Sequence, residues 1–216
     1  MPHSQSFSAI VLKTYDVGEA DRFCILFTRE NGRMAARASG ARRLKSRLGG
    51  LLLPLNRVNV ELKEGSGGWI VAGVSSEGFR GLRRFQGPDV AQFLQLEEGI
   101  ELLLRLVSDE GALPDVFDAT IKFIEACNGD VAHASLGYSF ALLHHLGYLP
   151  EEGEIQSMIP RMNSASHSYM RDSRAGLFQA PQPGCALDAL VQLRSILLEG
   201  HLATPLKAHD VVEAMR

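Results

Sequence analysis

The first eighty residues alternate between apolar and polar positions with the two-residue period that is typical of β-strands. Polar or glycine-rich turn signals separate the apolar segments, and Asn31-Gly32 is a strong hairpin signal. The pattern predicts five short strands, at residues 6–15, 22–28, 32–39, 57–63 and 69–75. Because the spacing leaves no room for crossover helices, we expect a small antiparallel barrel of the OB-fold type.

The third predicted strand presents arginine on one face. Side chains alternate across a strand, so Met34, Ala36 and Ala38 share the face that is turned toward the core. Arg33 and Arg37 therefore share the outward face. The aromatic residues of the predicted barrel are expected to serve mainly as core, and these are Phe7, Tyr15, Phe27 and Trp69.

After Gly87-Pro88 the apolar positions follow the helical period instead. Helices are predicted at residues 88–107, 113–124, 131–146, 187–198 and 206–215. Residues 164–180 are predicted to be irregular, with a candidate hairpin around residues 172–175. The predicted fold class is α+β, with an N-terminal five-stranded OB-fold β-barrel at residues 1–80 and a mostly α-helical C-terminal domain at residues 81–216.

One segment, Val131–Pro150, contains no Asp, Glu, Lys or Arg and has roughly the length of a membrane-spanning helix. Its histidines and serines would be unsatisfied in hydrocarbon, so we expect a buried helix and no membrane partner. The N-terminal residues lack the basic start and the apolar run of a signal peptide. The widely spaced Cys24, Cys127 and Cys185 indicate no disulfide framework, and reduced thiols suit a cytoplasmic location.

The net charge of −3 conceals two halves of opposite sign. Residues 1–84 contain 14 Lys and Arg against 7 Asp and Glu, whereas residues 85–216 contain 8 against 18. Between Arg29 and Arg47 stand seven cations and one acid, Glu30. This asymmetry indicates a polyanionic partner, and two solvated surfaces of chance sign are the alternative explanation.

The sequence contains no signature of an enzyme. It has no nucleotide-binding glycine loop with its lysine, no nucleophile elbow, no zinc-protease motif and no Cys-X-X-Cys pair. We therefore expect no catalytic residue, no cofactor and no metal ion.

Several motifs together carry a family resemblance. The segment Gly40–Gly50, with Leu52-Leu53-Pro54 after it and Gly18–Arg22 before it, stands in the N-terminal half. Phe140–Leu143 and Pro205–Lys207 stand in the second half. These motifs resemble those of the RecO family of bacterial DNA repair and recombination mediators, most strongly over residues 8–76.

The resemblance implies an OB-fold, a helical C-terminal domain and no enzymatic turnover. Proteins of this family bind single- and double-stranded DNA and anneal complementary strands. They also engage the C-terminal tail of single-strand-binding protein and join RecR to load RecA onto DNA. By the same resemblance, partner-binding residues are expected at Tyr138, Phe140 and Leu143.

The chain also departs from the family pattern. Ala35 and Ser39 stand where relatives usually have basic residues, whereas Arg37 replaces an apolar one. Many relatives have four cysteines that form a zinc site, and here that region contains only Cys185. We therefore expect a rearranged positive face and no zinc.

Our hypothesis is that six cations line a DNA track: Arg33, Arg37, Arg42, Arg43, Lys45 and Arg47. Arginine suits this task because its planar fork matches phosphate with two hydrogen bonds. One or two of the six are expected to brace a loop through surface ion pairs instead. The alternative function is a basic OB-fold interaction scaffold that binds an acidic protein or an RNA partner.

Overall fold

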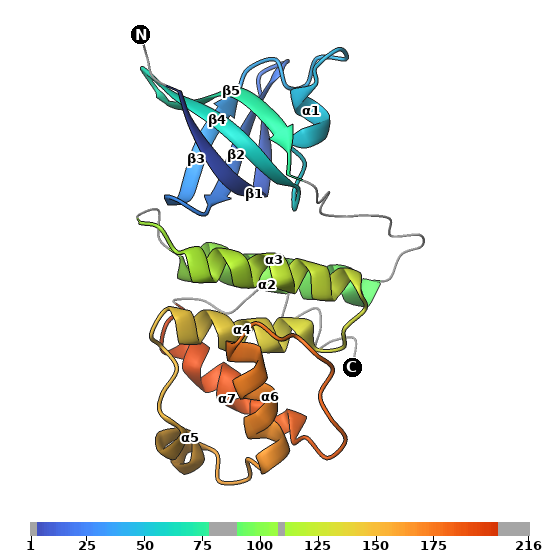
Figure 1. Cartoon of the computed structure of the whole chain (residues 1–216), viewed down its shortest axis with the longest axis vertical. Coiled ribbons are helices and arrows are strands. Elements are labelled where there is room, and N and C mark those ends of the chain that lie inside the picture. Colours follow the sequence, from blue (N-terminus) through green and yellow to red (C-terminus); the bar gives the residue numbers. More distant parts are fainter. Residues whose placement is uncertain (1–3, 78–89, 108–110, 203–216) are drawn as a thin grey trace. The chain divides into compact units, whose positions relative to one another are not determined.

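Five strands close into a barrel in the computed structural model of the chain (Figure 1), which describes residues 4–77, 90–107 and 111–202. The strands are β1 (Ser4–Val17), β2 (Asp21–Thr28), β3 (Gly32–Ala38), β4 (Arg57–Gly65) and β5 (Gly68–Ser76). Around the barrel the order is β1-β2-β3-β5-β4, and every neighbouring pair is antiparallel except β3 with β5. The predicted barrel is confirmed.

The predicted alternation along β3 is also confirmed. Met34, Ala36 and Ala38 are buried in the barrel core, whereas Arg37 is exposed and Arg33 is half-buried. Of the four barrel aromatics, Phe7 is buried in the barrel core, and Trp69 packs edge-on against it with ring centroids 6.2 Å apart. Phe27 is also buried, but on the outer face of β2, where its ring centroid lies 5.8 Å from that of Phe117. Tyr15 differs from these three, because it is 48% exposed on β1.

The connection from β3 to β4 contains a short helix, α1 (Leu48–Leu51), that the sequence pattern did not predict. Ala41 and Leu52, on either side of this helix, are buried in the barrel core. The side-chain amide of Asn56 donates a hydrogen bond to the carbonyl oxygen of Leu51 at 2.9 Å. Both ends of the connection are therefore fixed to the barrel.

The rest of the described chain is helical. Its helices are α2 (Val90–Leu106), α3 (Pro114–Asn128), α4 (Ala134–His145), α5 (Glu152–Met158), α6 (Ser164–Arg174) and α7 (Leu187–Glu199). Contact clustering separates two compact units, residues 1–85 with 107–117 and residues 86–106 with 118–216. The boundary after residue 80 stays a prediction, and the helix predicted at residues 206–215 lies outside the described residues.

The irregular segment and hairpin predicted within residues 164–180 are wrong, because α6 occupies most of this segment. Asn163 caps this helix, since its side-chain oxygen accepts a hydrogen bond from the Ser166 backbone N–H at 2.9 Å. The buried face of α6 consists of Ser166, Tyr169, Met170 and Ser173, which follow the helical spacing. Because two of these four buried residues are serines, the apolar positions alone do not show the helical period.

Helix α4 forms the centre of the helical unit, and all its residues from Ala134 to Leu143 are buried. The Tyr138 ring stacks on Phe123 at 4.2 Å between centroids, and its hydroxyl lies 2.7 Å from that of Thr120. Polar groups of α4 are thus satisfied within the protein. Among the described residues, no helix is both long and apolar enough to span a membrane.

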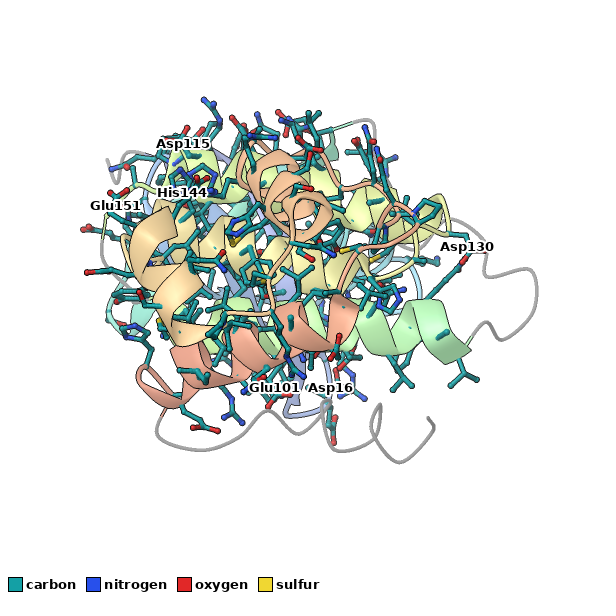
Figure 2. All side chains as sticks on the ribbon, turned by 90° about the horizontal axis from the view of Figure 1, so that it is seen from below. Asp16, Glu101, Asp115, Asp130, His144 and Glu151 are labelled. Carbon is teal, nitrogen blue, oxygen red and sulfur yellow. The ribbon has the colours of Figure 1, made fainter. Side chains whose placement is uncertain are left out.

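Charged side chains of the helical unit lie mainly at its periphery. Figure 2 shows Asp130 and Glu151 at the edges of the unit, and both residues are exposed. Glu98 of α2 is an exception: its side chain is 6% exposed and forms an ion pair with Arg194 of α7, itself 8% exposed, at 2.8 Å. This buried pair joins two helices of the unit.

Replacing Glu98 by Ala is expected to lower the free energy of unfolding by about 3–5 kcal/mol, because the Arg194 guanidinium stays buried without its carboxylate. The matched control is Glu101→Ala, which removes a more exposed ion pair with Arg105 within α2 and should cost less than about 1 kcal/mol. Urea denaturation followed by circular dichroism measures both. Equal losses for the two variants would contradict a structural role of the buried pair.

Candidate nucleic-acid interface

Three cations project from the connection between β3 and α1, and we call residues 39–47 the basic loop. Arg43, Lys45 and Arg47 are exposed, and their side chains form no ion pair or hydrogen bond with any residue that the structure describes. Leu44 between them is fully exposed, at 106% of its reference area. These three cations, which we call the crest of the basic loop, therefore offer positive charge to solvent outside any ion pair with a described residue.

Arg37, the last outward-facing residue of β3, forms an ion pair with a carboxylate. Its guanidinium contacts Asp21 through Nε at 2.8 Å and through Nη2 at 2.6 Å. The backbone N–H of Gly40 donates to the same carboxyl group at 2.8 Å. This N–H, followed by the Arg37 guanidinium, lowers the pKa of Asp21 from its ordinary value, and the nearby Arg43 contributes further. Asp21 thus joins β3 to the start of the basic loop.

Arg42 folds back over the turn between β1 and β2. Its Nε lies 3.2 Å from a carboxylate oxygen of Asp16, and its Nη1 donates to the Gly18 carbonyl oxygen at 2.9 Å. Arg22 approaches the same carboxylate at 3.6 Å. Exposed pairs of this kind add little stability, so their main effect is to fix where the basic loop lies.

Arg22 connects the barrel to the far end of the loop, a role that the sequence did not suggest. Its Nη1 donates to the carbonyl oxygens of Gly49 and Leu52, at 3.2 Å each. Gly49 also passes so close to the Ala41 carbonyl oxygen that a Cβ atom would collide with that backbone atom. The glycine in the motif is therefore required by close packing of the loop on itself.

The six predicted DNA-binding residues do not form one cluster. Arg37, Arg42, Arg43, Lys45 and Arg47 belong to the basic loop or to the adjoining end of β3. Arg33 lies four residues before Arg37, which along a strand is about 13 Å. It is half-buried beside the β2–β3 turn. The DNA-binding assignment of all six residues stays a prediction.

The predicted partner-binding residues occupy a different environment. Tyr138, Phe140 and Leu143 of α4 are each 0% exposed and belong to the interior of the helical unit. Their assignment to a partner surface stays a prediction. As placed here, they present no side-chain area to a partner.

Two buried thiols have raised pKa values. Burial raises the pKa of the Cys24 thiol to about 11 and that of Cys127 to about 12, which keeps both thiols neutral near pH 7. No group of three His, Cys, Asp or Glu residues that could hold a metal ion occurs within residues 4–77, 90–107 and 111–202.

Residue type and spacing could not reveal which cations are paired. The partners Asp16 and Asp21 precede the basic loop by about twenty residues, and the pairing of β1 with β2 and of β2 with β3 brings them to it. Strand parity could not identify Tyr15 as outward-facing, because Phe7, Ala9 and Val11 face the core and strict alternation would turn Tyr15 inward too. The β1–β2 register shifts between Val11 and Lys13, and this shift places Tyr15 on the outer face.

The chain is similar in sequence to known proteins over both the barrel and the helical unit. The family model described as "Recombination protein O N terminal" matches residues 1–70, which include the barrel strands β1–β4 and the basic loop. A "DNA repair protein RecO" of Anaeromyxobacter sp. (strain K) is 30% identical over 145 residues, covering 66% of this chain and 57% of that protein. One of Nocardioides sp. is 51% identical over 57 residues, 26% of this chain and 23% of that protein.

A longer match extends through the helical unit. The "DNA repair protein RecO" of Syntrophotalea carbinolica is 30% identical over 210 residues, covering 94% of this chain and 78% of that protein. The chain spans 57% of the length of the Anaeromyxobacter relative, so it corresponds to little more than half of some family members. The barrel and the basic loop lie within the matched family model, and the match to the Syntrophotalea protein covers nearly the whole chain. The chain therefore belongs to the RecO family.

Proposed function

We propose that this chain is a non-enzymatic DNA-binding protein of DNA repair and homologous recombination. It binds single- and double-stranded DNA, anneals complementary strands and helps to load RecA onto DNA covered by single-strand-binding protein. RecR and the C-terminal tail of single-strand-binding protein are its proposed protein partners. The names of the relatives, each "DNA repair protein RecO", support the repair role.

The observation that carries the proposal is the set of three unpaired cations on an anchored loop. Arg43, Lys45 and Arg47 have no carboxylate partner among the described residues, so binding of a phosphate breaks no internal ion pair. Each phosphate contact also releases condensed counterions, which makes binding strong, tolerant of sequence and sensitive to salt. These are the properties that a repair mediator needs.

Annealing follows from the same electrostatics. Two complementary strands repel each other through their phosphates, and a surface that neutralises both at once lowers that repulsion. Arg37 and Arg42 are already neutralised in part by Asp21 and Asp16, so the unpaired cations supply most of this effect. The barrel holds them in place, and no catalytic group is required.

Substituting Arg43, Lys45 and Arg47 together by Gln is expected to reduce the slope of log affinity against log salt by about 2 on single strands, since each contact contributes about 0.7. Annealing of complementary oligonucleotides should be lost. Fluorescence anisotropy across a salt series measures the slope.

The matched control removes the same charge from the helical unit by substituting its exposed cations Lys122, Arg161 and Arg171 by Gln. This variant should retain the slope of the unaltered protein. If both triple variants lose the slope equally, net charge and not the basic loop governs binding. Stronger binding of RNA than of DNA would favour the RNA-binding alternative.

Arg22→Met is expected to weaken DNA binding about 5- to 30-fold, the factor for one loop residue that must be ordered on binding, without changing the salt slope. The substitution removes the hydrogen bonds to Gly49 and Leu52, so the loop must be ordered when DNA binds, at a cost of about 1–2 kcal/mol for each residue fixed. The number of phosphate contacts stays the same. A reduced slope in this variant would instead place Arg22 directly on DNA.

A further inference from the structure

The outer surface of strands β1, β2 and β3 carries apolar groups where a barrel is usually polar. Cys24 and Leu26 of β2 face the core, so Phe23 and Ile25 face outward. The register places Tyr15 opposite Phe23 and Lys13 opposite Ile25. On the other side of β2, Phe23 lies opposite Arg37, and Ile25 lies opposite Ala35. We call these six residues the outer platform: Lys13, Tyr15, Phe23, Ile25, Ala35 and Arg37.

The rings of the outer platform are accessible. Tyr15 is 48% exposed, and Phe23 is half-buried. Directly opposed residues on antiparallel strands have Cβ atoms about 5 Å apart, so Tyr15 and Phe23 occupy neighbouring positions on β1 and β2. A tyrosine whose ring is buried in the core would expose little beyond its hydroxyl, unlike Tyr15. The structure therefore leaves Tyr15 exposed at one end of this face, whereas Phe27, farther along the same face of β2, is buried against Phe117.

Cations border this surface on both sides. The Lys13 ammonium nitrogen lies 5.3 Å from the centre of the Tyr15 ring. On the β3 side, the Arg37 side chain is 56% exposed and is held by Asp21. The Gly40 backbone N–H also donates to Asp21, so the outer platform adjoins the start of the basic loop. The platform is therefore bordered by Lys13 on β1 and, on β3, by Arg37 in its ion pair with Asp21.

We propose that the outer platform stacks unpaired nucleobases, with Tyr15 as the main stacking residue, and so gives the barrel a preference for single strands. Aromatic rings bordered by cations complement a strand whose bases are free and whose phosphates are negative. In a duplex the faces of the bases are hidden within the stack, so only the phosphates remain for the basic loop. This inference rests on the proposed DNA-binding function and adds a discriminating site to it.

The test is Tyr15→Ser, measured by fluorescence anisotropy with three probes: a single-stranded oligonucleotide, the same length of duplex, and a single strand of abasic sites. Affinity for the single strand is expected to fall about 5- to 150-fold, the effect of losing one stacked base. Affinity for duplex should change less than twofold, and the salt slope should stay unchanged. The variant should no longer distinguish the normal strand from the abasic one.

Tyr15→Phe is the matched control, because it retains the ring and should bind as the unaltered protein does. Leu177→Ser, at a residue 52% exposed in the helical unit, controls for removal of apolar surface elsewhere. If Tyr15→Ser melts at a lower temperature than the unaltered protein, Tyr15→Leu keeps the apolar bulk and serves as the second variant.

The outcomes separate the two proposals. Unchanged single-strand affinity in Tyr15→Ser, or an equal loss on duplex and single strand, overturns the stacking platform while leaving the basic loop in place. Failure of the unaltered protein to bind any DNA at low salt overturns the proposed function itself. Equal affinity of the unaltered protein for normal and abasic strands overturns the stacking platform alone.

Discussion

The ion pairs of Asp16 and Asp21 with the arginines around them determine how the basic end of the barrel is organised. Cations so close in sequence repel one another, and this repulsion would spread a free loop into solvent. The two carboxylates neutralise Arg37 and Arg42 at its base, and Arg22 ties its far end to the barrel. What remains is a fixed loop whose outer cations are still unpaired.

This arrangement separates two tasks among residues that look alike in the sequence. Arginines at the base of the loop hold the backbone, whereas those at its crest are available to an anion. Weak surface pairs suffice for the first task because Ala41 and Leu52 already anchor the loop in the core. The proposed base-stacking surface lies beside the loop, so phosphates and bases of one strand would meet different parts of the same barrel.

Much of the fold followed from the sequence, because period-two and period-3.6 patterns report directly which side chains are buried. The five strands, the parity of β3 and the central helix α4 were predicted in this way. Helix α6 was missed because serines form much of its buried face. Helix α1 was missed because four residues are too few to show a period.

The candidate site was predicted less completely. Composition located the cations, and strand parity oriented Arg33 and Arg37, but pairing depends on tertiary contacts. The partners of Arg37 and Arg42 lie at the end of β1 and the start of β2, which no local pattern links to the loop. The exposure of Tyr15 could not be predicted from the sequence either, since β-strand patterns do not distinguish an exposed aromatic residue from a buried one.

The most direct measurement is nuclear magnetic resonance of the arginine side-chain Nε–H groups while a single-stranded oligonucleotide is added. If the crest of the basic loop contacts phosphate, the signals of Arg43 and Arg47 shift in proportion to the bound fraction. The signal of Arg194, which is buried with Glu98, stays in place. Unmoved signals from Arg43 and Arg47, with shifts confined to arginines of the helical unit such as Arg161 and Arg171, would contradict the account.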